Sequence, residues 1–286
     1  MPDEVHLLPW GLLLLAGCGA TTPPSRVAVI ADKITPAQVL QARPMYFDLP
    51  GGESLSARVW ATTTPRHIVL GVHGFNDYSK AFAPLAQHLT VELQATVYAY
   101  DQRGFGADPQ PGVWPGTDTL LADLRHIAAQ LRVRYPGLPL TVVGESMGGA
   151  LVWVAAAETP GLMADHIVLK APAVWGANSM PWYQRLVAAS EAPGLSADQL
   201  ILKAPAVWGA SSMPWYQRLS LYTMNLLAPD MVFTGRGLPS LGIRPTDDIE
   251  VARDLSRDPL FIKATRVGSL AGVTELMGRA QSQTGL

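Results

Sequence analysis

The chain of 286 residues contains a single cysteine, Cys18, and few charged residues. One cysteine excludes an intrachain disulfide. Asp, Glu, Lys and Arg make up only 15% of the residues, and the formal net charge is −2. Because no basic run stands out, the charge pattern of a nucleic-acid-binding protein is missing, and we expect no nucleic-acid partner. The apolar residues, 48% of the chain, suffice for the core of one α/β domain with insertions, or of two small domains.

The sequence also lacks a long apolar run near its start. Residues 5–20 form an apolar stretch that is too short to span a bilayer but suits the hydrophobic region of a signal peptide. It contains Leu15-Ala16-Gly17-Cys18, which resembles a bacterial lipobox, although Asp3 and Glu4 stand where basic residues are usual. We expect residues 1–24 to be a signal peptide with lipidation at Cys18 and a tether. The protein would then be lipid-anchored in the bacterial cell envelope, with the outer membrane favoured by Gly19, or secreted; the alternative is an unprocessed apolar N-terminus.

Short apolar runs alternate with amphipathic segments along the rest of the chain. Two short strands are predicted within 45–61, and continuous apolar runs predict buried strands at 67–72, 96–100, 140–143 and 167–169. Helical periodicity is found at 79–94 and at 117–134, where Leu120, Leu124, Ile127 and Leu131 share one face. Strands that alternate with helices predict an α/β fold with a doubly wound, mostly parallel sheet, in which ligands bind at the carboxyl ends of the strands.

One serine stands in the pattern of a nucleophile. Gly144-Glu145-Ser146-Met147-Gly148-Gly149 follows a predicted strand and precedes the helical run ALVWVAAAE. A G-x-S-x-G segment in this context predicts a sharp strand-to-helix turn that exposes the serine hydroxyl. The positive end of the helix then faces the oxygen on which negative charge develops. We expect Ser146 to be the catalytic nucleophile.

The turn after residues 67–72 is the expected partner of this serine. Its sequence is His73-Gly74-Phe75, and the backbone amides of Phe75 and Met147 are predicted to form the oxyanion hole. We do not expect His73 to be the base, because it would lie beneath this hole. Asp101 is interpreted as a structural brace of the turn that follows its own strand, with Arg103 as its ion-pair partner.

The segments VHGFNDYS, YAYDQRGFG and GESMGG, in this order and spacing, resemble the α/β-hydrolase fold. More narrowly, residues 42–280 are similar to bacterial monoacylglycerol lipases and lysophospholipases of the serine aminopeptidase-like family. The resemblance implies a core at 25–174, a helical cap at 175–265, and the start of a return to the core at 266–286. It also implies cleavage of a small lipid ester without a metal or organic cofactor.

Two features depart from this family. Its catalytic acid and histidine follow the cap, but only His166 follows Ser146, and it precedes the cap. We therefore expect the triad acid, the histidine and the last strands of the fold to be missing, because Asp247, Asp254 and Asp258 lie in polar cap segments. Activity would then be impaired. The alternative is a non-catalytic envelope lipoprotein or a degenerate hydrolase fragment.

The second departure is a tandem repeat. Residues 154–186 return as 187–219, with seven differences. Each copy contains the end of a helix, a loop, a strand and the start of the cap. The two strands, IVLKA and LILKA, are far enough apart in the chain for a parallel crossover. We expect either that copy two pairs beside copy one in the sheet, or that one copy is looped out.

Overall fold

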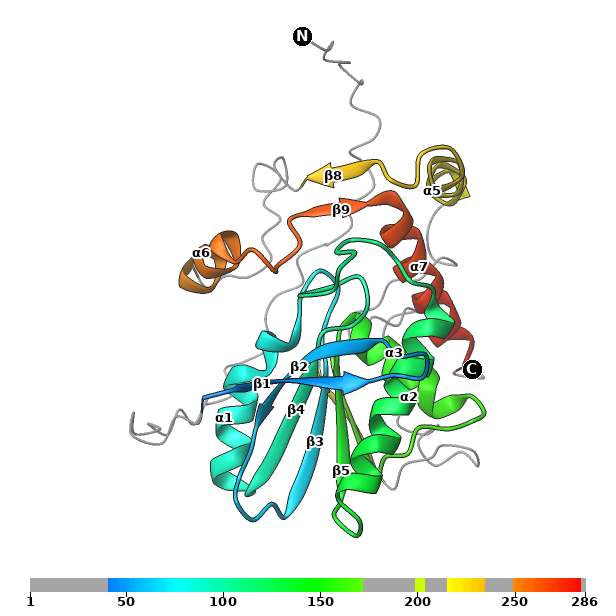
Figure 1. Cartoon of the computed structure of the whole chain (residues 1–286). Coiled ribbons are helices and arrows are strands. Elements are labelled where there is room, and N and C mark those ends of the chain that lie inside the picture. Colours follow the sequence, from blue (N-terminus) through cyan, green and yellow to red (C-terminus); the bar gives the residue numbers. More distant parts are fainter. Residues whose placement is uncertain (1–40, 172–198, 204–214, 235–248, 284–286) are drawn as a thin grey trace, which may run out of the picture.

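The computed structural model describes residues 41–171, 199–203, 215–234 and 249–283 (Figure 1). The predicted signal peptide, with Cys18, lies outside these residues. Asp247 and most of the second repeat copy lie outside them as well.

The centre of the structure is a seven-stranded sheet in the order β1-β2-β4-β3-β5-β6-β7. The strands β3 to β7 run parallel, and β1 and β2 form an antiparallel hairpin at one edge. Their bounds are Arg43–Asp48, Ser54–Trp60, His67–Val72, Ala95–Tyr100, Leu140–Glu145, His166–Lys170 and Gln199–Lys203. The predicted mostly parallel α/β sheet is confirmed.

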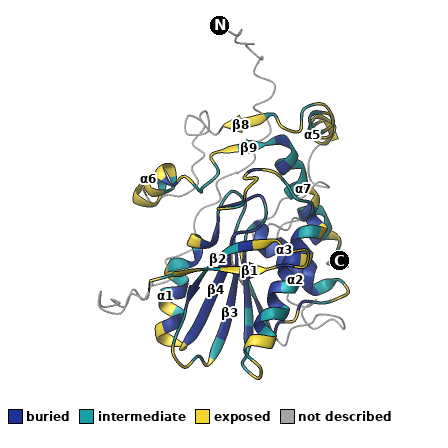
Figure 2. Ribbon diagram, in the orientation of Figure 1, coloured by how far each residue is buried: buried dark blue, intermediate teal, exposed yellow. Residues whose placement is uncertain are grey.

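Helices cover both faces of this sheet, and Figure 2 shows the strands between them as mostly buried. The 3₁₀ turn η3 and the helix α1 lie on one face, and α2, α3 and α7 lie on the other. Alternate residues of β3 point to opposite sides: Val69 packs with α1, whereas Leu70 joins the larger core cluster. The bounds are Ser79–Phe82 for η3, Ala83–Glu92 for α1, Thr117–Arg134 for α2, Met147–Ala157 for α3 and Val267–Ser282 for α7.

The apolar face predicted for residues 117–134 is the buried face of α2. Leu120, Leu124, Ile127 and Leu131 are each at most 1% exposed. The helix ends at Arg134, before Pro136 and Gly137, as the sequence predicts.

Both copies of the repeated strand lie in the sheet. His166 of β6 is the partner of Gln199 in β7, and Lys170 is the partner of Lys203. Each pair is separated by 33 residues, so the two copies align with each other position by position. The prediction of a parallel pairing is confirmed, and β7 covers the edge of β6 that would otherwise be open to another chain.

The described part of the predicted cap lies above the sheet in Figure 1. It contains α5 (Trp215–Leu227), α6 (Ile249–Arg257) and an antiparallel pair of β8 (Val232–Thr234) and β9 (Ala264–Arg266). Neither α5 nor α6 has a buried residue. The boundaries expected for core and cap stay a prediction. In the described part of the chain, no helix is long and apolar enough to cross a bilayer.

The helix α7 returns from the cap to the core. Leu276 and Ala280 are buried in the larger core cluster, and the Trp153 indole N–H of α3 donates to the Ala280 carbonyl at 3.2 Å. The Arg279 guanidinium binds both carboxylate oxygens of Glu158 at 2.7 Å. These contacts fix α7 beside α3, the helix that begins after Ser146.

Candidate active site

Ser146 lies at a sharp bend between β5 and α3. Its backbone angles, φ 52° and ψ −116°, are a strained conformation for a residue with a side chain. Small neighbours make the bend possible: a Cβ on Gly144 would lie 2.6 Å from the Gly148 carbonyl oxygen. The Ser146 amide donates to the Lys170 carbonyl at 3.0 Å, and its carbonyl accepts the Ala150 amide at 3.1 Å. Hydrogen bonds on both the amide and the carbonyl of Ser146 therefore fix its backbone in the bend between β5 and α3.

The turn after β3 lies against this serine. In the sheet, Val72 is the partner of Gly144, so the residues that follow the two strands are neighbours. A Cβ on Gly74 would come within 3.4 Å of the Ser146 Cβ. The predicted turn and the predicted nucleophile are thus brought together at the carboxyl ends of β3 and β5. This is where the strand order reverses, and doubly wound folds bind ligands at such a point.

Two backbone amides at this place are candidates for binding an oxyanion. Within the described residues, neither the Phe75 N–H nor the Met147 N–H donates a hydrogen bond. Met147 is the first residue of α3, whose first turn contains no acidic residue. The helix dipole therefore adds positive potential beside Ser146. The Phe75 ring rests edge-on against Phe105, with their centroids 5.7 Å apart, which fixes the side chain next to one of the two amides.

His73 is a structural residue of the turn. It is fully buried; Nδ1 donates to the Gly74 carbonyl at 2.8 Å, and Nε2 accepts the Gln102 amide at 3.0 Å. Burial lowers the pKa of His73 to about 4, although the Gly74 carbonyl and the Asp101 charge act in the opposite direction. Since both ring nitrogens are engaged and the ring is neutral, it cannot take a proton from Ser146, in agreement with the sequence-based expectation.

Asp101 braces two turns, and its predicted ion-pair partner was wrong. Its carboxylate accepts the Ser79 amide at 2.9 Å and the Ala107 amide at 3.0 Å. Arg103 points elsewhere: it pairs with Asp123 at 2.7 Å and with Glu53 at 2.5 Å. Two backbone amides already satisfy Asp101, so the guanidinium binds the carboxylates on α2 and on the β1–β2 hairpin instead.

Acidic and basic groups surround the bend. Glu145 forms an ion pair with Lys170 at 2.7 Å, in a partly exposed position. Burial raises the pKa of Asp77, and the charges of Glu145 and Asp258 raise it further, against the opposing hydrogen bond from the Tyr78 amide. The Asp77 carboxyl is therefore easier to protonate than an exposed aspartate.

Within the described residues, no histidine is hydrogen-bonded to Ser146. His166 is the sheet partner of Thr141, five residues before Ser146, and so lies about 17 Å away along the strand. His166 is the first residue of β6, at the end of the strand away from the bend.

The expectation for Asp258 needs correction. The sequence predicts that Asp258 lies in a polar cap segment, but it is 9% exposed, and its carboxylate accepts a hydrogen bond from the Tyr78 hydroxyl at 2.6 Å. Asp254, in contrast, lies on the exposed helix α6. Sequence reasoning missed Asp258 because its partner is 180 residues away and no local pattern connects the two.

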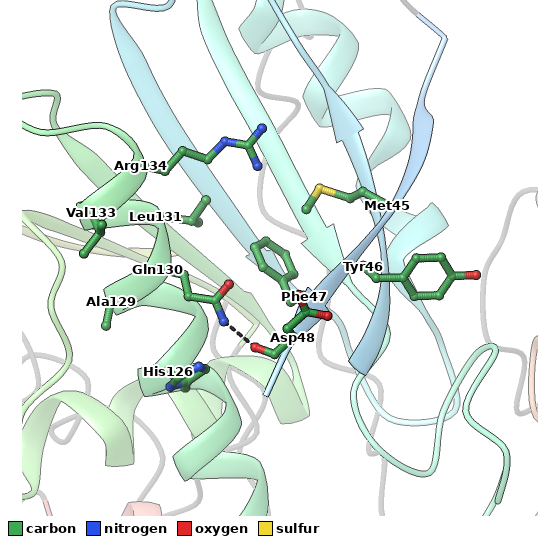
Figure 3. A pocket seen from close by; sticks show the side chains of 10 residues that line it. All are labelled: Met45, Tyr46, Phe47, Asp48, His126, Ala129, Gln130, Leu131, Val133 and Arg134. Atoms are coloured by element: carbon green, nitrogen blue, oxygen red, sulfur yellow. Dashed lines mark hydrogen bonds between the residues drawn. The ribbon is translucent and has the colours of Figure 1, made fainter. Parts of the chain in front are cut away.

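A separate open groove of about 530 Å³ lies between β1 and the second half of α2 (Figure 3). Gln130 bridges its walls by donating to the Asp48 carbonyl at 2.6 Å. Its lining is Met45, Tyr46, Phe47, Asp48, His126, Ala129, Gln130, Leu131, Val133 and Arg134. None of these residues belongs to the bend or the turn, so the groove is not part of the candidate site.

A parallel sheet in this strand order, with a strained serine between strand and helix, defines an α/β-hydrolase. The chain belongs to the Hydrolase_4 family, described as serine aminopeptidase S33, whose model matches residues 63–197 and 188–286. The two matched ranges overlap at 188–197, just after the junction of the two repeat copies at 186 and 187.

Curated relatives match part of the chain. A human monoglyceride lipase is 31% identical over 145 residues, which are 48% of this chain and 47% of the relative. A monoacylglycerol lipase from Mycolicibacterium smegmatis is 32% identical over 126 residues, covering 43% of this chain and 44% of the relative. This chain spans about half the length of the curated relatives it matches.

Solved structures support the same fold. A soluble variant of the monoglyceride lipase from Saccharomyces cerevisiae, in complex with a substrate analog, superposes with a TM-score of 0.57 at 19% identity, covering 85% of this chain and 71% of that one. A thermostable carboxyl esterase from Bacillus coagulans, in complex with glycerol, gives 0.55 at 18% identity, covering 82% and 72%.

Proposed function

We propose that this chain is a serine hydrolase of carboxylic esters that acts on a monoacylglycerol or a lysophospholipid-like lipid. The observation that carries the proposal is the bend at Ser146, with the turn after β3 against it. The monoglyceride lipases among the relatives support the choice of a lipid ester.

In the proposed reaction, the Ser146 Oγ attacks the ester carbonyl carbon and loses its proton. The negative charge on the carbonyl oxygen is accepted by the amides of Phe75 and Met147. The C–O bond to the alcohol then breaks, the alcohol takes up a proton, and the acyl group stays on Ser146. Water cleaves this acyl ester in a second, equivalent step and releases the fatty acid.

The transfer of the Ser146 proton is the step for which the described residues provide no base. Both nitrogens of His73 are occupied, and His166 lies at the opposite end of its strand. In related sites, the loss of triad members costs on the order of 10⁴- to 10⁶-fold in rate. We therefore propose that the chain by itself reacts slowly. A non-catalytic lipid-binding protein is the second candidate, and the same observation favours it.

A fluorophosphonate probe with a long alkyl chain tests the proposal, because it reacts only with an activated serine. We expect slow labelling of the native protein, located at Ser146 by peptide mass spectrometry, and none of the Ser146→Ala variant. A Ser79→Ala variant is the matched control, since Ser79 is a buried serine at the same edge of the sheet. If native and heat-denatured protein label alike, the hydrolase proposal is wrong, and binding of a monoacylglycerol without turnover would support the second candidate.

We also propose that Cys18 is lipidated and anchors the protein in a bacterial cell envelope, with the outer membrane favoured, or that the protein is secreted. The support is the sequence Leu15-Ala16-Gly17-Cys18 after an apolar stretch.

A further inference from the structure

One segment of the chain, residues 258–265, lies between α6 and the end of β9 and reaches back to the turn after β3. We call it the strap. The Ile262 amide donates to the Asn76 carbonyl at 3.0 Å, and the Asn76 side-chain amide donates to the Thr265 hydroxyl at 2.7 Å. Together with Asp258, these contacts connect the strap to residues 76–80.

Asp258 is the most strongly bound residue of the strap. Its carboxylate accepts hydrogen bonds from the Tyr78 hydroxyl at 2.6 Å, the Lys80 ammonium at 2.7 Å and the Leu260 amide at 3.0 Å. Burial alone would raise the pKa of Asp258, but these three donors outweigh it and lower the pKa to about 2. The carboxylate is therefore charged and fully partnered, whereas α6, which precedes it, has no buried residue. Burial of a carboxylate costs free energy unless hydrogen bonds and an ion pair compensate for it, so Asp258 depends on these three donors.

The strap acts next to the proposed oxyanion donor. Asn76 follows Phe75 directly and has a φ of 64°, in the left-handed region. Its carbonyl and its side chain are both held by the strap. The side chains of Phe75 and Ile262 both pack, partly buried, on the larger core cluster. A change in the strap can therefore reach the Gly74–Phe75 peptide, which carries the proposed donor amide, through the backbone of two adjacent residues, Asn76 and Phe75.

We propose that the strap fixes the turn that presents the Phe75 amide, and that Asp258 is its positioning residue. The proposal rests on the oxyanion role proposed above for Phe75. Asp258 touches no reacting atom in this view; it acts through Tyr78 and Lys80, which follow the donor in the same turn.

Hydrogen exchange tests the proposal without any turnover. The amides of Asp77 and Tyr78 report on the turn, because each forms a hydrogen bond inside it. We expect Asp258→Asn to raise their exchange rates about 10-fold or more, with amides 147–156 of α3 unchanged. Lys80→Met should act in the same direction, and Lys80→Arg should stay close to the native protein because it keeps the cation.

Asp165→Asn is the matched control. Asp165 also accepts one backbone amide, that of Leu140 at 2.7 Å, and pairs with one cation, Arg132 at 2.6 Å. It lies at the amino ends of β5 and β6, whereas the turn lies at the carboxyl ends of the strands. We expect it to leave the exchange of Asp77 and Tyr78 unchanged. If Asp258→Asn leaves these two amides unchanged, or accelerates exchange equally throughout α3, the strap does not position the turn and the proposal is overturned.

Probe labelling connects the strap to chemistry. With the fluorophosphonate probe, Asp258→Asn should lower the maximal labelling rate about 10-fold and leave the half-saturating probe concentration unchanged. An effect on half-saturation alone would overturn the positioning role. If the native protein is not labelled at all, the proposed hydrolase function fails, whereas the exchange experiment still decides whether the strap holds the turn.

Discussion

Gly148 is a position where the addition of a single methyl group should destabilise the protein. It is the second residue of α3, and a Cβ there would lie 2.2 Å from the Val72 carbonyl oxygen and 2.6 Å from that of His73. Both oxygens are main-chain atoms at the end of β3. Since carbon contacts are ordinary only from about 3.5 Å, α3 and β3 would have to separate by about 1 Å.

The expected cost follows from two opposing effects. Overpacking of a closely packed site costs about 1 to 3 kcal/mol, and a clash with a backbone lies at the upper end of that range. Replacement of Gly by Ala within a helix recovers at most about 1 kcal/mol. We therefore expect Gly148→Ala to lower the free energy of unfolding by about 2 kcal/mol, and the melting temperature by about 4 to 8 °C.

The control is Gly268→Ala. Gly268 is also the second residue of a helix, α7, but a Cβ there would lie at an ordinary 3.4 Å from the Pro229 carbonyl oxygen. We expect it to be neutral or up to about 1 kcal/mol more stable than the native protein. Urea unfolding followed by circular dichroism measures both variants. Equal stability of the two would refute the close approach of α3 and β3 on which the geometry of the site depends.

Three further predictions concern other parts of the chain. Because burial lowers the pKa of His73 from 6.5 to about 4, the unfolded chain binds more protons between these values. Stability should therefore rise by about 3 kcal/mol from pH 4 to pH 7, and urea unfolding should show this slope in the native protein but not in His73→Gln. Deletion of residues 187–219 leaves one copy of the repeat. It removes the last strand of the described sheet, β7, and the first five residues of α5, whose sequence WYQRL is present again at 182–186. It should leave a folded protein by circular dichroism, and an unfolded product would show that β7 is essential. Cys18→Ser should abolish the incorporation of a labelled fatty acid and release the protein from the membrane fraction; retention of both would exclude Cys18 as the anchor.

Local sequence patterns predicted those strands, helices and turns whose structure depends mainly on their own residues. Continuous apolar runs identify β3, β4 and β5 because both faces of a parallel sheet are covered, and the step of Leu120, Leu124, Ile127 and Leu131 identifies α2. Gly144 and Gly148 predicted the bend at Ser146, since their missing side chains allow a helix and two strands to meet.

The contacts that depend on distant partners were not predictable in the same way. Arg103 was expected to bind Asp101, two residues away, but it pairs with Glu53 and Asp123 on other elements. Asp258 was taken for a polar cap residue because nothing near it in the sequence indicates burial. Tertiary packing decides which carboxylate an arginine meets, and no local sequence pattern records that choice.

The turn of residues 73–80 is held by three partners from two parts of the chain. Gln102 binds His73 through ring and backbone, Asp101 binds the Ser79 amide, and Asp258 binds Tyr78 and Lys80. The first two partners follow β4 within the core, whereas the third belongs to the strap. Two of the three supports therefore do not depend on the cap. The exposed helices α5 and α6 can change in sequence without moving the Phe75 amide, provided that Asp258 keeps its partners. In such an arrangement, the exposed helices of the cap and the turn that carries the proposed oxyanion donor can vary independently.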